Sequence, residues 1–354
     1  MSDHAYLPPS GATDWSACAM WPQMQIDYPD LGDPASSEEG TVAHAVLAAY
    51  LGHGNMPADA TEEMHDGALM VLSNLPPGVR EWRVEQRLKG RRIHDSQNWG
   101  TPDLVGWADM HLHGVDYKFG HGHVDHVANL QVINYLALEL ERAEVDGLVE
   151  QQIMVSVHIA QPRAFGHEPF RTWTVPATEL RPYINQLREA ATRATRLDRK
   201  ATTGSQCDHC NGRHACQALA DVSWRAVDMS SGSLPLQIKP AAMGTELAIL
   251  QAAQRRLAAR ITGLEAQVAH HVKSGTAVAG WRMESGLGHR KWSLPDDQVV
   301  GLLGPAVAKS TVITPAQAVK AGLDASLVDA VTQREPTAAK LVQSDEKLAA
   351  RVFR

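Results

Sequence analysis

One stretch of the chain carries side chains that could cut a phosphodiester bond. Asp103 closes the sequence Gly100-Thr101-Pro102-Asp103, and Asp116 stands two residues before Lys118. The segment around Asp116 is predicted to be a strand, in which residues two apart point to the same face, so a carboxylate lies beside an ammonium group. A hairpin at residues 108–110 would bring Asp103 alongside. Two converging carboxylates suit Mg²⁺ or Mn²⁺, and a neighbouring lysine can orient water or offset charge on a phosphate.

An Asp-x-Lys tripeptide is common by chance and usually marks an exposed strand face. The elements around these residues favour a functional site instead. The apolar run over residues 104–107 predicts the centre of a sheet. A charged pair at the end of a buried strand needs a partner or a function, because unpaired burial is costly. A helix is predicted over residues 125–142, and on it Gln131 and Tyr135 share one face. For that pair alone, ordinary helix surface is the simpler interpretation.

A histidine lies on a predicted helix upstream of the acidic residues. His44 ends the sequence Gly40-Thr41-Val42-Ala43-His44, and this helix is expected to run to about Leu51. Ser36 or Ser37 is the expected N-cap, and Ser36 and Glu39 have the spacing of a capping box. Alone, a histidine in this position is more often a packed core or surface residue than a metal ligand.

Taken in order, these residues resemble the RecB-like branch of the PD-(D/E)xK nuclease superfamily, with its helical His, Asp, (D/E)-x-K and Q-x-x-x-Y. The resemblance covers about residues 1–220 and implies an α/β fold, with a mixed central sheet flanked by helices. It implies that a metal is held by His44, Asp103, Asp116 and the carbonyl of Tyr117. It implies catalytic roles for Asp103, Asp116 and Lys118, with Lys118 assisting the attacking water. Gln131 and Tyr135 would contact substrate or support the site. Asp116 stands where many relatives have Glu.

The chain has four cysteines, Cys18, Cys207, Cys210 and Cys216. A disulfide framework is not expected, because the N-terminal sequence lacks the profile of a secretion signal. Use of all four in one site favours a metal centre over a Cys-x-x-Cys redox pair. Their order resembles the iron–sulfur staple of AddB-type and CRISPR-associated RecB-like nucleases, which implies a [4Fe–4S] cluster joining the two ends of the nuclease domain. Zinc is the alternative, because His209 and His214 lie within the triplet and permit a Cys₃His or Cys₄ site.

Composition and charge narrow the class of protein. The 354 residues are 44% hydrophobic, and no apolar run approaches the ~20 residues that span a bilayer. We therefore expect a soluble cytoplasmic protein of a bacterium or of a phage-infected host. The net charge of −7 argues mildly against a DNA-binding protein. Basic residues nevertheless gather in two stretches, which are either solvated faces or a groove that guides phosphates. They are Arg80, Arg83, Arg87, Lys89, Arg91 and Arg92, and then Arg188, Arg193, Arg196, Arg199 and Lys200.

Two domains are predicted, a nuclease domain over residues 1–225 and a mostly helical C-terminal domain over residues 226–354, with a linker at 229–233. Strands are expected at 81–89, 102–108, 111–118, 152–160 and 169–175, and helices at 61–74, 178–200 and 241–273. Residues 280–292 are predicted to form a β-hairpin that turns at Gly286-Leu287-Gly288. Its basic and tryptophan residues would either clamp a nucleic-acid strand or form a small structural unit. They are Trp281, Arg282, His289, Arg290, Lys291 and Trp292. This tail resembles the C-terminal region of phage and prophage RecB-like proteins.

The sequence thus predicts a metal-dependent DNA exonuclease, acting on single strands or free DNA ends, with no membrane partner and with a possible homo-oligomeric state. One alternative is a non-catalytic nucleic-acid-binding or scaffold protein built on a nuclease fold. Another is a zinc-stabilised regulator in phage biology.

Overall fold

The computed structural model describes residues 5–31, 34–164, 166–230, 240–285, 291–308, 314–333 and 340–343. The chain forms two compact units, residues 1–263 and 264–354. A long helix, α8 (Pro240–Lys273), begins in the first unit and ends in the second. The boundary between these two units falls inside a helix, and the predicted division into domains at residues 225 and 226 stays a prediction. Of the linker expected at residues 229–233, residues 229 and 230 end α7 (Gln217–Ser230), and residues 231–233 lie outside the described residues.

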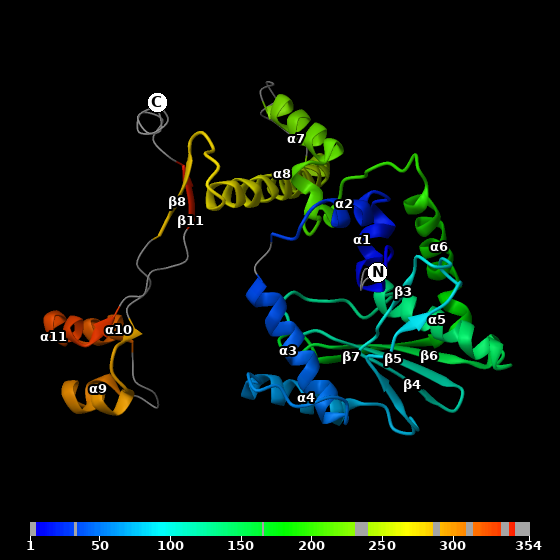
Figure 1. The fold of residues 1–354 in the computed structure, drawn as a ribbon, viewed down its shortest axis with the longest axis horizontal. Coiled ribbons are helices and arrows are strands. Elements are labelled where there is room, and N and C mark those ends of the chain that lie inside the picture. The colour runs from blue at the N-terminus through cyan, green and yellow to red at the C-terminus, as the bar shows by residue number, and fades with distance from the viewer. Residues whose placement is uncertain are drawn as a thin grey trace. The chain divides into compact units, whose positions relative to one another are not determined.

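The centre of the first unit is a mixed sheet whose order is β1-β4-β5-β6-β7 within the described residues (Figure 1). Its strands are β1 (Trp82–Val84), β4 (Leu104–Ala108), β5 (His111–Tyr117), β6 (Met154–Ala160) and β7 (Phe170–Pro176). β5 and β6 run parallel, and the other neighbouring pairs are antiparallel. The predicted hairpin between β4 and β5 is confirmed, and Asp109 at its tip has a left-handed backbone with φ of 51°. A mixed sheet flanked by helices confirms the α/β class.

Helices cover both faces of this sheet. They are α3 (Pro34–Tyr50), α4 (Glu62–Asn74), α5 (Leu130–Val145) and α6 (Arg181–Thr195). α5 and α6 share a hydrophobic core with Leu112 of β5 and Val157 of β6. α3 and α4 share another core with Val115 and Tyr117. Because side chains alternate along a strand, Asp116 points to the face that carries α5, while its neighbour Tyr117 points to the face that carries α3.

Local capping decides where several helices begin. The Asn129 side chain accepts a hydrogen bond from the Val132 N–H at 3.2 Å, so α5 begins at residue 130 and not at the predicted 125. Thr61 caps α4 in the same way, and that helix matches its prediction. α3 begins at residue 34, so Ser36 and Ser37 lie inside the helix and the predicted capping box is wrong. α6 is shorter than predicted, because residues 177–180 form a 3₁₀ turn and the helix ends at residue 195.

The strand predicted over residues 81–89 is divided between two sheets. β1 joins the central sheet, whereas β2 (Leu88–Lys89) pairs with β3 (Trp99–Gly100). Between them Glu85 has a φ of 48°, a left-handed conformation that turns the chain away from the first strand. This break creates a small two-stranded ribbon beside the central sheet.

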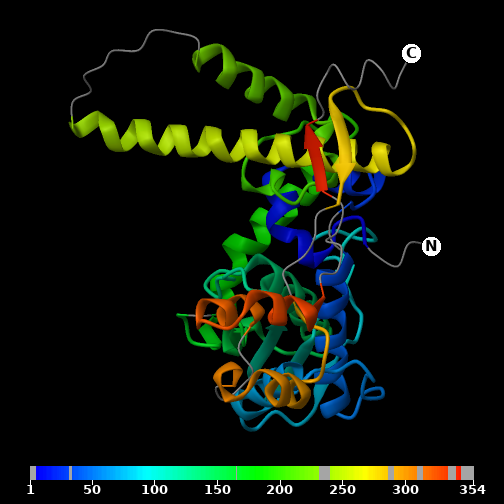
Figure 2. The same ribbon diagram turned by 90° about the vertical axis from the view of Figure 1, so that its left-hand side faces the viewer.

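The N-terminal segment packs against a later part of the same unit. It consists of the 3₁₀ turn η1 (Pro9–Gly11) and the short helices α1 (Ala12–Ala17) and α2 (Trp21–Asp27). Trp15 is fully buried, and its indole N–H donates to the Pro8 carbonyl at 2.9 Å. α1 contacts α6 and the 3₁₀ turn η4 (Ser205–Cys207), and α2 contacts η5 (Asn211–His214). Figure 2 shows this N-terminal segment, in dark blue, beside the green segment that precedes α8.

The second unit contains short elements after α8. Its helices are α9 (Asp296–Leu303), α10 (Pro315–Lys320) and α11 (Ala325–Ala330). β8 (Trp281–Glu284) pairs with β11 (Lys340–Gln343), and β9 (Lys291–Trp292) pairs with β10 (Thr332–Gln333). The hairpin predicted over residues 280–292 is therefore wrong, because each arm pairs with a strand that lies later in the chain. Residues 286–290, which include the predicted turn, His289 and Arg290, lie outside the described residues. Within the described ranges, no helix is both long enough and apolar enough to cross a bilayer.

Candidate functional site

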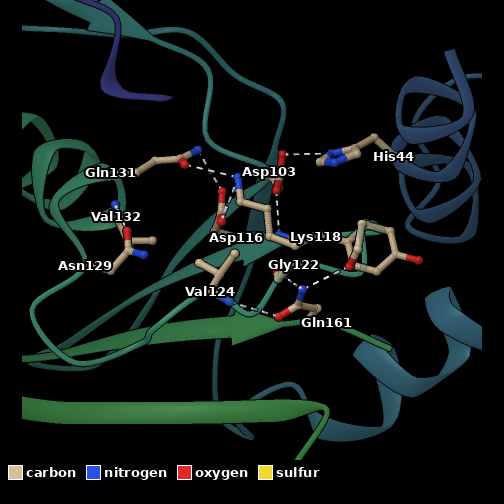
Figure 3. Close-up of polar contacts among 12 residues, drawn as sticks. His44, Asp103, Asp116, Lys118, Gly122, Val124, Asn129, Gln131, Val132 and Gln161 are labelled. Carbon is tan, nitrogen blue, oxygen red and sulfur yellow. Dashed lines mark hydrogen bonds and ion pairs between the residues drawn. The ribbon is translucent and has the colours of Figure 1, made fainter. Parts of the chain in front are cut away.

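The predicted site residues gather at the carboxyl end of β5, where the two helical layers meet (Figure 3). α3 brings His44 from one face of the sheet, and α5 brings Gln131 from the other. Asp103 lies directly before β4, which is the antiparallel neighbour of β5. The fold thus brings to one place residues that the chain separates by up to 87 positions, from His44 to Gln131.

The Asp103 carboxylate links α3 to the central sheet. Its Oδ1 lies 3.0 Å from His44 Nδ1, and its Oδ2 accepts the backbone N–H of Tyr117 at 2.6 Å. Each oxygen of the carboxylate therefore has a fixed partner, one on a helix and one on a strand. The predicted convergence of His44 with Asp103 is confirmed. The Tyr117 backbone is also at the site, and its predicted use as a carbonyl ligand stays a prediction.

Asp116, Lys118 and Gln131 form a closed triangle of polar contacts. Lys118 Nζ lies 3.0 Å from Asp116 Oδ2 and donates to Gln131 Oε1 at 3.0 Å. Gln131 Nε2 in turn donates to Asp116 Oδ1 at 2.8 Å. Asp116 is only 3% exposed, so this carboxylate is a buried group held by a cation and an amide. The prediction that Asp116 and Lys118 share one face is confirmed by their contact.

Burial and neighbouring charges act differently on the two carboxyl groups. Burial raises the pKa of Asp116 to about 6, with the Asp103 charge adding to the effect and Lys118 opposing it. Burial also acts to raise the pKa of Asp103, but the His44 and Lys118 charges and the hydrogen bonds outweigh it, so that pKa is lowered. The pKa of Lys118 is raised, since the attraction of Asp116 and Asp103 exceeds the effect of its burial. The two carboxylates thus repel each other within one pocket, which is a setting that favours an added cation.

The donor set fits a hard divalent cation, although no ion-binding arrangement is complete. Among the described residues, no three His, Cys, Asp or Glu side chains are placed to hold a metal ion. At this site the reason is visible, because Asp116 faces Lys118 and Gln131 while His44 faces Asp103. Asp116 Oδ2 nevertheless accepts no hydrogen bond within the described residues, having only its ion pair with Lys118. Two carboxylates and an imidazole are donors that Mg²⁺ or Mn²⁺ accepts.

Tyr135 stands one helical turn after Gln131 and lines the inner side of the site. It is 6% exposed and packs against Leu88 and Leu138. Burial raises the pKa of its phenol, and the negative charges of Asp103 and Asp116 raise it further. The phenol is therefore neutral and close to both carboxylates, consistent with the supporting position expected for it.

A buried glutamine that the sequence did not single out fixes the loop after Lys118. Gln161 is fully buried at the end of β6, and its Nε2 donates to the carbonyls of Gly120 at 2.9 Å and Gly122 at 2.6 Å. Its Oε1 accepts from the N–H of Val124 at 3.3 Å, as Figure 3 shows. The signal that could have revealed it is a polar residue placed directly after an alternating, buried strand.

Arg163 is a second supporting residue that sequence reasoning missed. Its guanidinium makes two-pronged contacts with Glu39 of α3 and with Glu63 of α4, at 2.7–2.9 Å. It also lies over the Phe119 ring, 3.9 Å from the centroid. Arg163 therefore ties the helix that carries His44 to the sheet end that carries Lys118. Its pairing explains why Glu39 serves a tertiary contact and not a helix cap.

The four cysteines converge on a small cavity of about 20 Å³ between the N-terminal segment and residues 201–219. All four are buried. Cys18 follows α1, and the other three lie at or beside η4 and η5. The Thr202 N–H lies 3.5 Å from Cys18 Sγ. The predicted clustering of Cys18 with the distant triplet is confirmed.

The thiols of this cluster are close enough to influence one another. Burial, together with the three neighbouring cysteines, raises the pKa of Cys210 to about 12. Burial also raises the pKa of Cys207, as do Cys216 and Cys18. His214 does not line the cavity, since its ring bonds the Asn211 carbonyl and stands edge-on to Tyr28. His209 is exposed and is also absent from the lining. The lining of the cavity therefore offers four thiols and no imidazole. Among the described residues no three of these side chains are placed to hold an ion, and a metal centre here stays a prediction.

Most of the first basic stretch is neutralised by carboxylates. The paired residues and their partners are Arg80 with Asp109, Arg83 with the buried Glu139, Arg91 with Asp95, and Arg92 with Glu144 and Glu150. In the second stretch, Arg196 pairs with Asp198, while Arg188 and Arg193 donate to backbone carbonyls. Many of these charges are therefore already paired or turned to the backbone, and a groove that guides phosphates along the two stretches stays a prediction.

The family model DUF2800, described as a protein of unknown function, matches residues 79–347. The matched region contains Asp103, Asp116 and Lys118, together with the cysteine triplet and most of the second unit. It begins after His44 and Cys18. The resemblance to RecB-like nucleases stays a prediction beside this match.

Proposed function

This chain belongs to the DUF2800 family, and we propose that its site hydrolyses phosphodiester bonds of DNA with the help of Mg²⁺ or Mn²⁺. The proposed activity is that of an exonuclease acting on single strands or free ends. The observation that carries the proposal is the triangle of Asp116, Lys118 and Gln131 beside the Asp103–His44 pair. A half-buried lysine, two carboxylates and an imidazole meet at one strand end, where helices from both faces supply the remaining polar groups.

Each residue has a role that follows from its contacts. His44, Asp103, Asp116 and the Tyr117 carbonyl would hold the metal. Such a metal lowers the pKa of bound water and polarises the phosphate. Lys118 supplies a positive charge within 3.0 Å of Asp116, where it can offset negative charge that develops on the phosphate. Gln131 orients Lys118 and Asp116 through its two hydrogen bonds, and Tyr135 keeps this side of the pocket closed.

The cysteine cluster is proposed to hold a [4Fe–4S] cluster, with Zn²⁺ as the alternative. Four buried thiols without histidine in the lining suit either centre. The centre would join the N-terminal segment to residues 201–219 and so close a long loop of the chain, which limits the freedom of the unfolded state. Its role would be structural, because the cysteines are on different elements from the carboxylates.

A non-catalytic DNA-binding protein is the second candidate. The observation that favours it is that the ligating groups satisfy one another without a cation, with His44 on Asp103 and Lys118 on Asp116. Such a protein would bind DNA through the same unit and release no nucleotides.

Degradation of labelled DNA in the presence of Mn²⁺ or Mg²⁺, with EDTA as the metal-free control, separates the two candidates. Asp116→Asn and Lys118→Met keep the size of each side chain but remove its charge. We expect each to lower the rate by at least about 100-fold, the usual cost of removing a group that stabilises transition-state charge. Asp59→Asn and Lys320→Met are matched controls at exposed positions and should cut like the parent. Equal cleavage by all four variants, with circular dichroism showing them folded, would remove the hydrolase proposal.

A further inference from the structure

The long helix α8 carries an apolar stripe with the spacing of a coiled coil. α8 has 34 residues, about three times the average length of a helix in a globular protein. Along it, seven residues recur at alternating intervals of three and four, which is the spacing of positions a and d in a heptad repeat. We call these seven residues the seam, and all but one of them are apolar. The a positions are Leu247, Gln254, Ile261 and Val268, and the d positions are Leu250, Leu257 and Leu264.

The large side chains of the seam are exposed to solvent. Figure 2 shows α8 as one continuous helix. Four of its seam residues are between 42% and 57% exposed, namely Leu247, Leu250, Ile261 and Leu264. A single exposed leucine is ordinary, but a continuous apolar stripe of this length marks a surface that a partner covers.

The side of α8 away from the seam is already packed within the first unit. Ala259 is buried in one cluster with two of the cysteines. A Cβ on Gly263 would lie 3.0 Å from the backbone nitrogen of His214, and Arg260 donates to the Arg213 carbonyl at 3.1 Å. Ala259 and Gly263 occupy heptad positions f and c, which point away from a and d. The contacts that hold α8 to the first unit therefore leave the seam open.

The residue types of the seam fit a second copy of the same helix, aligned parallel and in register. Leucine at each d position, with Ile261 and Val268 at a positions, is the combination that favours two parallel strands. Gln254 is the one polar residue of the seam, and in this arrangement it meets its own copy, with which its amide can exchange hydrogen bonds. In an antiparallel pair, position a faces position d, so Gln254 would be buried against a leucine instead.

Charge and contact area agree with this pairing. In a parallel coiled coil, position g of one helix lies beside the following position e of the other. Arg260 at g therefore meets Glu265 at e, and Glu246 at g meets Gln251 at e, so that no like charges face each other. Residues 244–271 extend over about 40 Å, and two helices about 10 Å wide cover roughly 800 Å² between them. Interlocking side chains bury more accessible surface than this flat area, which brings the contact to the ~1,000 Å² that a specific interface needs.

We propose that the seam of α8 forms a parallel, two-stranded coiled coil with α8 of a second copy of this chain. The same surface of each copy contacts the other, so the dimer has two-fold symmetry and closes on itself. Each copy keeps its own carboxylate site and cysteine cluster, because none of the seam residues belongs to either. The dimer is therefore independent of the proposed hydrolase activity.

Sedimentation equilibrium of the full chain tests the dimer, in about 0.5 M salt to suppress bridging by nucleic acid. The parent should have twice the mass of one 38.5 kDa chain. Leu250→Glu combined with Ile261→Glu should raise the dissociation constant at least about 100-fold, because like charges then face each other in the seam. Ile249→Glu is the matched control, since Ile249 is 59% exposed on the same helix but lies outside the seam, and it should remain a dimer. A monomeric parent, as expected if α7 or another protein covers the seam, would overturn the proposal.

A cysteine placed at the N-terminal end of the seam tests the direction of the two helices. In the parallel arrangement, Leu247→Cys brings two thiols opposite each other, and oxidation should link most chains into dimers on a non-reducing gel. In an antiparallel pair Leu247 would face Leu264 of the other copy, which separates the two thiols by about 25 Å and prevents a bond. Ile249→Cys, outside the seam, and the parent, whose four cysteines are buried, should show little linkage. A Leu247→Cys protein that dimerises but does not link would contradict the parallel coiled coil.

Discussion

The carboxylates at the end of β5 and the thiols beside α1 are both buried, but they have opposite surroundings. Asp103 and Asp116 each have a basic or cationic partner at 3.0 Å, His44 and Lys118 respectively. The cysteines line a cavity of about 20 Å³ among apolar neighbours such as Met24 and Leu219. The first group of side chains is joined by ion pairs and hydrogen bonds, whereas the thiols lie among apolar residues with Thr202, Gln206 and Arg213 also in the lining.

This difference predicts what the proposed metal would contribute to each cluster. The carboxylate site is held in place by protein contacts alone, so loss of a cation there should remove chemistry and leave the fold. The thiols have pKa values raised by burial and by one another, and they must lose protons when they bind a metal. Their metal should therefore contribute to folding itself. Variants in each cluster test that contrast.

The largest effect should follow loss of one thiol. Cys207→Ser or Cys210→Ser should release the bound iron or zinc and lower the free energy of unfolding by at least about 3 kcal/mol, because structural metal binding is coupled to folding. Iron and zinc are measured by elemental analysis of anaerobically purified protein, and stability by denaturant titration. A broad visible absorption band that disappears with the cysteine indicates an iron–sulfur cluster, and a colourless parent containing zinc indicates the alternative.

His209→Ala is the matched control for the cysteine variants. His209 stands between Cys207 and Cys210 but does not line the cavity, so this variant should keep both metal and stability. In contrast, removing the divalent cation from the parent with EDTA should stop cleavage without changing its denaturation midpoint. A cysteine variant as stable as the parent, or a parent destabilised by EDTA while its cysteine-bound metal is retained, would contradict the contrast.

The sequence was sufficient for the parts of the site that depend on local spacing. Alternation along a strand placed Asp116 and Lys118 together. Helical spacing placed Gln131 and Tyr135 on one face, but only the resemblance to RecB-like nucleases placed that face at the site. The order of elements also indicated the mixed sheet, because an alternating buried strand follows a crossover helix. These features depend on backbone periodicity, which a single sequence displays directly.

Contacts between residues that are distant in the sequence could not be predicted from spacing. Nothing near Arg83 indicates that it pairs with Glu139, 56 positions later, and so the basic stretch looked more open than it is. Arg163 meets Glu39 across 124 positions. The hairpin predicted over residues 280–292 was wrong for a related reason. Strand partners depend on packing in three dimensions and not on the nearest turn in the sequence.

A smaller effect should follow removal of Arg163, which holds α3 over the carboxylate site. Arg163→Met keeps much of the apolar stem but loses the hydrogen bonds to Glu39 and Glu63. We expect the free energy of unfolding to fall by about 1–2 kcal/mol, because solvent at the half-exposed carboxylates screens part of the interaction. Denaturant titration measures this change, and the Mn²⁺ concentration needed for cleavage should rise because His44 is less well positioned.

Arg196→Met is the matched control for this helix anchor. Arg196 also forms a two-pronged pair, with Asp198, but both side chains are mostly exposed, so its loss should leave stability and metal requirement as in the parent. Arg163→Lys should recover only part of the stability, since an ammonium cannot make the same paired contacts. If Arg163→Met matched Arg196→Met in both measurements, the helix that carries His44 would need another anchor.

A smaller change in stability is expected from a third buried cluster, formed by His113 and His158. It shares one property with the thiols and one with the carboxylates. His113 and His158 are buried and neutral like the thiols, yet they have hydrogen-bond partners like the carboxylates. His113 Nδ1 lies 3.1 Å from His158 Nε2, and His158 Nδ1 lies 2.8 Å from Thr172 Oγ1. His111 stacks on His113 with ring centroids 4.1 Å apart. This histidine ladder lies on the sheet face that carries α3 and α4, since His113 alternates with Gly114 and Asp116 along β5.

The ladder should make stability fall as the solution becomes acidic. Burial, together with the neighbouring histidine charges, lowers the pKa of His113 to about 4 and that of His158 to about 3. The unfolded chain, with a histidine pKa near 6.5, then binds more protons than the folded chain between about pH 6.5 and pH 4. The stability that the ladder contributes is therefore complete above about pH 7 and falls by on the order of 1 kcal/mol per histidine by about pH 6. Denaturant titrations at several pH values measure the slope, and His158→Gln should flatten it because glutamine keeps polar contacts without titrating. His53→Gln, at an exposed position, should leave the slope unchanged. If the stability of the parent protein is constant across this pH range, the folded histidines are protonated as easily as the unfolded ones. They would then not resemble the buried thiols, whose charged form burial disfavours.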